Sequence, residues 1–294
     1  MDTVQFALLR GICQLPAYIA AERGFLDDEG IDARISIAPT AWTVPERMGR
    51  GEVEFAVIPW TRVAADRNTS NRMVLIAGSG IEEAALVVRT GLDEREVRRV
   101  AVPQEGGIKD LTAMALLDRM GWSDVEVVRM PSGDGAILAF VGEGADAASM
   151  VEPWAAMLEH LGLGRVVRRT GDVWPGAPGC SLTTTARVIA ERPELVLRMV
   201  RAYMKAARFV ADDPAEAARV GARYIGVGEH VVLRALEANR PDPNAIRSDA
   251  AMASILELMT KRGYVETAPV GYRDLSFLDQ VELEQSFGST VPPG

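Results

Sequence analysis

Side chains that could bind a small acidic molecule lie in short segments directly after predicted strands. An arginine shielded from water can hold a carboxylate or sulfonate by two parallel hydrogen bonds, and tryptophan rings provide flat apolar walls. The residues that share this position are Arg10, Gly11, Cys13, Gln14, Trp42, Trp60, Gly78, Ser79, Gly106, Gly107, Ile108, Glu152 and Trp154. We expect these residues and Cys180 to contact a small anionic ligand with an apolar or ring-bearing body.

The sequence lacks the motifs of the common catalytic classes. It contains no G-x-x-x-x-G-K-[ST], G-x-S-x-G or H-E-x-x-H motif, and Gly78-Ser79-Gly80 lacks the third glycine of a dinucleotide-binding fingerprint. Its two cysteines and two histidines form no motif with the spacing of metal ligands. We therefore expect no metal, no cofactor and no catalytic residue, with Cys13 as the alternative nucleophile.

Length and charge limit the class of protein. The 294 residues correspond to about two domains of typical size. A net charge of −9 without a visible basic patch excludes nucleic acid as an expected partner. The longest apolar runs are far shorter than the ~18 residues of a membrane span, and Arg10 and Gln14 interrupt the only candidate for an export signal. We expect a periplasmic protein if a leader has been removed, and a cytoplasmic one if Met1 is the native start.

Strand and helix patterns alternate along the first half of the chain. These elements must position the segments that carry the candidate binding residues. The predicted strands are 4–9, 31–37, 55–58, 73–77 and 84–89, followed after a polar stretch by 100–102, 125–130 and 145–150. After residue 186 only helical patterns follow. This order is typical of mainly parallel sheets covered by helices.

The restart of the pattern predicts two lobes. We expect residues 1–89 to form the first part of lobe 1, residues 90–184 an inserted lobe 2, and residues 185–294 the return to lobe 1 with C-terminal helices. Open parallel sheets bind ligands beyond the carboxyl ends of their strands, so these ends should face a cleft between the lobes. The alternative is two independent domains with a featureless interface.

Three motifs in the expected order resemble one family. They are the helix Pro16–Leu26 (PAYIAAERGFL), the crossing Ile76–Arg89, and Ala145–Ala148 followed by Val151–Trp154, which is similar to a "G-x-x-D-A…E-P" signature. The chain resembles nitrate/sulfonate/taurine-type substrate-binding proteins of ABC transporters, an NMT1/THI5-like group with the type II periplasmic-binding-protein fold. The resemblance implies a monomer that captures a small anion by lobe closure and presents it to an ABC permease.

The same fold includes cytosolic enzymes, which leaves a second hypothesis. An aromatic desulfinase with this fold is similar in placing a cysteine after the first strand and ahead of a proline, where Cys13 precedes Pro16. At a helix N-terminus we expect the pKa of such a thiol to be lowered, which favours nucleophilic cleavage of a C–S or C–C bond. However, neither His160 nor His230 lies in an expected cleft segment. Ligand-sensing proteins of the same fold are a third alternative.

Overall fold

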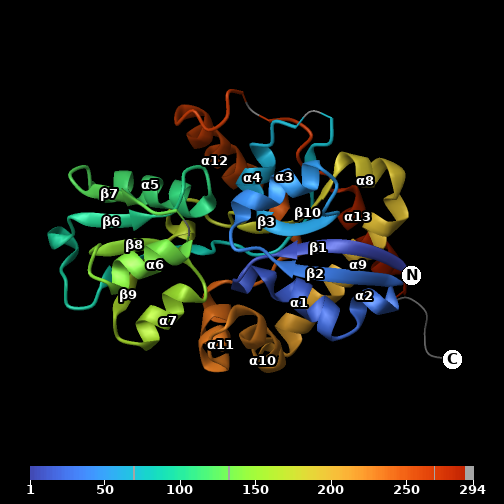
Figure 1. The fold of residues 1–294 in the computed structure, drawn as a ribbon, viewed down its shortest axis with the longest axis horizontal. Coiled ribbons are helices and arrows are strands. Elements are labelled where there is room, and N and C mark those ends of the chain that lie inside the picture. Colours follow the sequence, from blue (N-terminus) through green and yellow to red (C-terminus); the bar gives the residue numbers. More distant parts are fainter. Residues whose placement is uncertain (69, 132, 268, 289–294) are drawn as a thin grey trace.

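Two five-stranded sheets form the framework of the chain, one in each lobe (Figure 1). The computed structural model describes residues 1–68, 70–131, 133–267 and 269–288. In spatial order the first sheet contains β2 (Ile31–Ile37), β1 (Asp2–Leu8), β3 (Phe55–Pro59), β10 (Cys180–Thr185) and β4 (Met73–Gly78). The second contains β7 (Glu126–Arg129), β6 (Arg99–Val102), β8 (Ala147–Val151), β5 (Ala84–Arg89) and β9 (Gly164–Arg169).

One strand in each sheet runs against its neighbours. β10 pairs antiparallel with β3 and β4, and β5 pairs antiparallel with β8 and β9, whereas β1 with β2 and β6 with β7 are parallel. β5 carries the chain into the second lobe and β10 carries it back. Each of these strands therefore begins at the junction, where its neighbours end. The predicted fold class, mainly parallel sheets with an inserted lobe and C-terminal helices, is confirmed.

The two crossings between the lobes occur earlier than the boundaries we expected. The sequence pattern places β5 (Ala84–Arg89) in lobe 1, but this strand pairs within the second sheet, and β10 begins lobe 1 again at Cys180. The crossings are residues 79–83 and 170–179, and the amide of Gly179 donates to the carbonyl of Gly80 at 2.8 Å. The apolar pattern of a strand shows that it is buried but not which sheet it joins, which explains the difference.

Short helices cover the sheets of both lobes. In the first lobe these are α1 (Leu15–Glu22), α2 (Phe25–Asp28), α3 (Val44–Gly49) and α4 (Trp60–Ala64), and in the second α5 (Ile108–Met120), α6 (Gly133–Val141) and α7 (Trp154–His160). Short 3-10 turns include η1 (Ile12–Gln14), η2 (Ala41–Thr43), η3 (Glu94–Glu96), η4 (Thr170–Asp172) and η5 (Pro243–Arg247). In β5, alternate side chains pack on opposite faces of the sheet, Leu86 toward α5 and Val87 toward α6.

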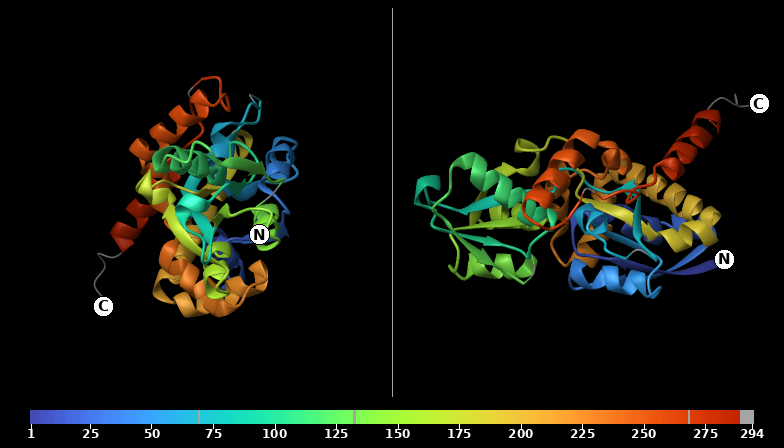
Figure 2. Two further views of the ribbon diagram at one scale, coloured as in Figure 1. Left: turned by 90° about the vertical axis from the view of Figure 1, so that its left-hand side faces the viewer. Right: turned by 90° about the horizontal axis from the view of Figure 1, so that it is seen from above.

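The C-terminal helices pack on the first lobe and also touch the second. They are α8 (Ala186–Glu191), α9 (Pro193–Asp212), α10 (Pro214–Ile225), α11 (Glu229–Ala238), α12 (Asp249–Lys261) and α13 (Ser276–Gly288). The helix α9 packs on α1, whereas α11 contacts α7 and α12 contacts α5. Figures 1 and 2 show α11 and α12 on either side of the junction between the lobes. In the described residues, no helix combines the length and apolar character needed to cross a membrane.

A substitution at Val57 tests how much the core of the first lobe contributes to stability. Val57 lies in the middle of β3 and is fully buried. We expect Val57→Ala to lower the free energy of unfolding by about 1.5–3 kcal/mol in urea denaturation, because a buried side chain is shortened. The same substitution at Val270, which is 83% exposed, should change it by less than about 0.5 kcal/mol. Equal losses at the two positions would contradict the assigned burial.

Candidate functional site

A cavity of about 340 Å³ lies between the lobes. Its walls come from the ends of strands and the first turns of helices in both lobes. The first lobe contributes the segments after β1, β2 and β3, and the second contributes the start of α5 and the segment after β8. This is the edge at which open parallel sheets usually bind ligands.

Most of the residues expected at the site line this cavity. They are Arg10, Gly11, Cys13, Gln14, Trp42, Gly107, Ile108, Trp154 and Cys180. Trp60, Gly78, Ser79, Gly106 and Glu152 do not line it, although Gly78 is the last residue of β4 and the other four each follow a strand as predicted. Position after a strand therefore selects the correct end of the sheet, but not the direction in which each side chain points.

Trp60, Ser79 and Gly78 support the first lobe instead of facing the cavity. Trp60 is fully buried in the core and its ring stacks on Tyr272 with centroids 6.2 Å apart. The hydroxyl of Ser79 bonds to the Cys13 carbonyl and to the Tyr203 hydroxyl, and so fixes the loop that carries Cys13. A Cβ at Gly78 would lie 2.5 Å from the Asp242 carbonyl oxygen, so close backbone packing requires glycine there.

Glu152 links the lobes through its backbone. Its carbonyl accepts a hydrogen bond from the Ile12 amide at 3.2 Å, while its buried carboxyl accepts from the Ala156 amide and pairs with Arg169, both at 2.9 Å. Burial raises the pKa of this carboxyl, and the positive charge of Arg169 offsets only part of that rise. Gly106 also has a structural role, because its amide donates to the Asp110 carboxylate at 2.9 Å.

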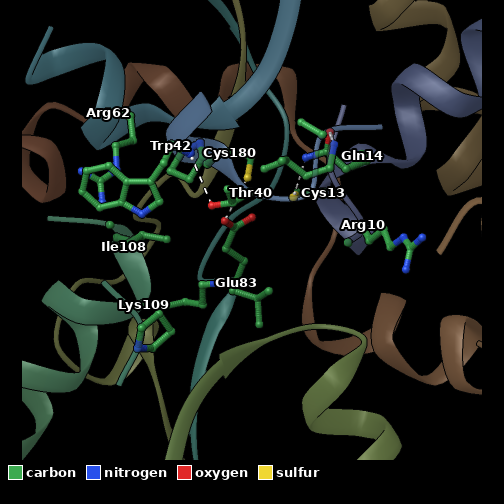
Figure 3. Close-up of a pocket in the computed structure, with 18 of the residues that line it drawn as sticks. Arg10, Cys13, Gln14, Thr40, Trp42, Arg62, Glu83, Ile108, Lys109 and Cys180 are labelled. Carbon is green, nitrogen blue, oxygen red and sulfur yellow. Dashed lines mark hydrogen bonds between the residues drawn. The ribbon is translucent and has the colours of Figure 1, made fainter. Parts of the chain in front are cut away.

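Arg62 is the main cavity residue that the sequence analysis missed. Its guanidinium carbon lies 3.3 Å from the centroid of the Trp42 ring (Figure 3). Its Nη2 donates across the lobes to the Glu105 carbonyl at 2.6 Å. Burial lowers the pKa of Arg62 to about 10, so the side chain remains a cation at neutral pH. The only available signal was its place two residues after Trp60, in the first turn of a helix that follows a strand.

Arg10 does not occupy the anchoring position that we expected. It borders the cavity, but its side chain is exposed and extends away from Thr40, Trp42 and Glu83 (Figure 3). Besides Arg10 at the border, the lining contains the positive charges of Lys109 and Arg62, and the N-terminus of α5 begins beside them at Ile108. Positive charge and helix N-termini both favour an anionic ligand.

Two thiols and a carboxyl group form the floor of the cavity. Cys13, Glu83 and Cys180 are buried, and the Cys180 thiol donates to Glu83 Oε1 at 3.3 Å. Burial raises the pKa of Glu83, against opposing hydrogen bonds from Cys180. A hydrogen bond with Cys180 lowers the pKa of the Cys13 thiol, but burial and Glu83 together raise it by more.

These thiols do not match the desulfinase-like hypothesis. We expected a lowered pKa for the Cys13 thiol, and it is raised because the loop buries the sulfur beside an acidic group. His160 and His230 bond to each other, Nε2 to Nε2 at 3.0 Å, across the contact between α7 and α11, and neither lines the cavity. The cavity therefore offers Cys13 no histidine that could act as a base.

Comparisons with known proteins agree on one family and one fold. The model of the NMT1-like family matches residues 2–226. A Brucella abortus protein whose name describes a binding protein is 22% identical over 216 residues, which are 71% of this chain and 67% of the relative. The family resemblance inferred from the sequence is confirmed.

Two solved structures illustrate the fold. The ligand-binding component of an ABC-type import system from Staphylococcus aureus, with zinc bound, gives a TM-score of 0.83 at 14% identity, covering 96% of this chain and 99% of that chain. The alkanesulfonate-binding protein of Xanthomonas axonopodis bound to MOPS gives a TM-score of 0.77 at 14% identity, covering 93% and 99%. At such low identity the likeness shows the periplasmic-binding-protein fold.

The buried carboxyl of Glu152 predicts a pH dependence of stability. Its pKa is raised in the folded state above the ordinary value of 4.5, so the unfolded chain loses this proton first as the pH rises. The contribution of Glu152 to the free energy of unfolding should therefore be greatest below pH 4.5 and fall as the pH rises through the raised pKa. In the variant Glu152→Gln this decrease in the free energy of unfolding should be absent. Urea denaturation over a series of pH values measures the difference. Parallel profiles for the two proteins would contradict the raised pKa.

Proposed function

The chain belongs to the NMT1-like family, and from this membership and the geometry of the cavity we propose that it is a substrate-binding protein for a small organic anion. The ligand would be a sulfonate, an aromatic carboxylate or a similar molecule. The observation that carries the proposal is that cationic and aromatic side chains of both lobes line one cavity, with Arg62 and Trp42 on one side and Lys109 and Trp154 on the other.

The size of the cavity supports a small ligand. Cavities that bind small molecules range from about 300 to 1,000 Å³, so a cavity of about 340 Å³ suits a compact molecule. Ile37, Ile108 and the tryptophan rings supply apolar surface for its body, while Arg62 and Lys109 supply charge for its acidic group. A hydrogen bond to a charged group contributes on the order of 1.5 to 3 kcal/mol.

The contacts between the lobes support capture by closure. The lobes meet at both sides of the cavity, through the Ile12 amide on Glu152 and through Arg62 on the Glu105 carbonyl. A ligand that touches both lobes binds the closed form more tightly than an open one and shifts the population toward it. Delivery of the captured anion to an ABC permease follows as part of this proposal and would place the protein in the periplasm. The alkanesulfonate-binding protein with the same fold and a bound sulfonate buffer supports the ligand class.

A ligand screen tests the proposal directly. Sulfonates including MOPS and taurine, aromatic carboxylates, nitrate and pyrimidines are compared by thermal shift in a phosphate buffer that contains no sulfonate. A true ligand at a hundred times its Kd stabilises the folded state by about 2.7 kcal/mol. The proposal fails if calorimetry with the same compounds also detects no binding.

Arg62 should provide much of the selectivity for anions. For any sulfonate or carboxylate that binds, we expect Arg62→Met to weaken binding by about 10- to 150-fold, since a charge-assisted hydrogen bond of about 1.5–3 kcal/mol is lost. The affinity of a neutral analogue, such as the matching sulfonamide, should change much less. Arg168→Ala, at an exposed position of β9 that does not line the cavity, is the matched control for loss of a positive charge and should retain the original affinity. Equal losses for the charged and the neutral ligand would remove Arg62 from the role of anion anchor.

A further inference from the structure

The cavity floor carries three chemically reactive groups that the proposed function does not use. Cys13 follows β1, Glu83 ends the first crossing, and Cys180 begins β10. The two Sγ atoms and a carboxyl oxygen of Glu83 all lie within 4.8 Å of one another, and all three residues are buried. Figure 3 shows both sulfur atoms and the carboxyl turned toward one another.

The polar atoms around this cluster are incompletely paired. Glu83 is only 2% exposed, yet its Oε2 has no hydrogen-bond partner among the described residues. Asn239 is 1% exposed, and neither atom of its side-chain amide has a partner in that same part of the chain. Both side chains border Gly80, since a Cβ placed there would lie 2.7 Å from Asn239 Oδ1 and 3.2 Å from Glu83 Oε2. Buried polar atoms in native proteins are nearly always satisfied, so this group needs a further partner.

We propose that Cys13, Glu83 and Cys180 bind a thiophilic divalent cation of the zinc class, with a fourth coordination position that faces the cavity. Thiolate sulfur selects zinc and related soft or borderline metals, whereas magnesium and calcium prefer sites made of oxygen ligands. Two cysteines and one carboxylate leave one position of a tetrahedral zinc for water or another ligand. All three side chains line the cavity, so that position is open to a molecule inside it.

The geometry is close to what the ion requires. Zinc–sulfur bonds of about 2.3 Å in a tetrahedron set the two sulfur atoms roughly 3.8 Å apart. The two sulfur atoms lie at most 4.8 Å apart, so they need to approach by no more than about 1 Å, and Cys180 Sγ already lies 3.3 Å from Glu83 Oε1. The backbone encloses the carboxyl tightly, because a Cβ on Gly179 would lie 2.1 Å from Glu83 Cδ. The carboxyl is therefore fixed in position before the ion binds.

Charge also favours a cation. Two thiolates and a carboxylate carry three negative charges, of which a divalent ion neutralises two. Ion binding replaces the protons of both thiols, so it is strongest in mildly alkaline solution. The inference does not rest on the proposed capture of an organic anion, because the ion binds to the two thiols and the carboxyl of the floor, whereas the proposed anion is held by the charges of Arg62 and Lys109.

The experiment uses the reduced, chelator-treated full chain, with two free thiols verified by a thiol assay. Co²⁺, Cd²⁺ and Zn²⁺ are titrated separately at mildly alkaline pH. We expect one equivalent to bind, with thiolate-to-metal charge-transfer absorption for Co²⁺ and Cd²⁺, and Zn²⁺ to displace Co²⁺. Mg²⁺ should not compete. Cys13→Ser, Cys180→Ser and Glu83→Gln should each weaken Zn²⁺ binding by at least about tenfold, the smallest usual loss even for a group that only supports a metal ligand.

The histidine pair provides the matched control. His160 and His230 are a second pair of possible metal ligands in close contact, with Nε2 atoms 3.0 Å apart. The double variant His160→Gln/His230→Gln should retain the Zn²⁺ affinity and the charge-transfer band. Loss of binding in this variant, with retention in the cysteine variants, would overturn the proposal.

X-ray absorption on the wild-type protein tests the site even if a variant fails to fold. The zinc edge should show two sulfur neighbours at about 2.3 Å and oxygen neighbours at about 2.0–2.2 Å. A shell of only nitrogen and oxygen, or absence of any stoichiometric binding by the reduced protein, would show that the cluster is not a metal site. Neither result would affect the test of organic anion binding.

Discussion

The two crossings between the lobes determine where everything else in this protein can lie. Residues 79–83 and 170–179 run side by side and are joined by hydrogen bonds from the Gly179 amide to the Gly80 carbonyl and from the Glu82 amide to the Ala177 carbonyl. The Ser79 hydroxyl also holds the loop of Cys13. Since β4, β5 and β10 begin or end at these crossings, both sheets present their ligand-binding edges to the same space. The cavity and its floor are a consequence of this junction.

The apolar strands and the two-lobed arrangement could be predicted from the sequence, but two strands could not. The six residues of β10 include four with hydroxyl groups, and all six are buried. Two of these hydroxyls donate to main-chain carbonyls, that of Thr184 to Glu54 at 2.8 Å and that of Thr183 to Ser181 at 3.1 Å. β9 is rich in arginine because it lies at the edge of its sheet. A search for apolar patterns in the sequence therefore finds neither β9 nor β10.

The site was predictable to the level of segments, not of side chains. Trp42 and Trp60 both follow strands, yet Trp42 stacks with Arg62 at the cavity whereas Trp60 fills the core. Arg10 and Arg62 also lie differently from what the sequence suggests. Arg10 follows the first strand, yet its side chain extends outward, whereas Arg62 lies at the cavity. The cluster of Cys13, Glu83 and Cys180 has no signature in the sequence at all. Its members come from three distant segments that only the junction brings together.

The antiparallel strand in each sheet also affects the order in which the lobes can form during synthesis. All strands of the second sheet, β5 to β9, are complete once Arg169 has left the ribosome. The first sheet still lacks β10, which pairs between β3 and β4, until Thr185 has emerged. The second sheet is thus formed by one continuous piece of chain, whereas the first sheet has an open gap between β3 and β4 until β10 emerges. An unfilled gap of this kind is a natural binding place for a chaperone or for a strand of another nascent chain.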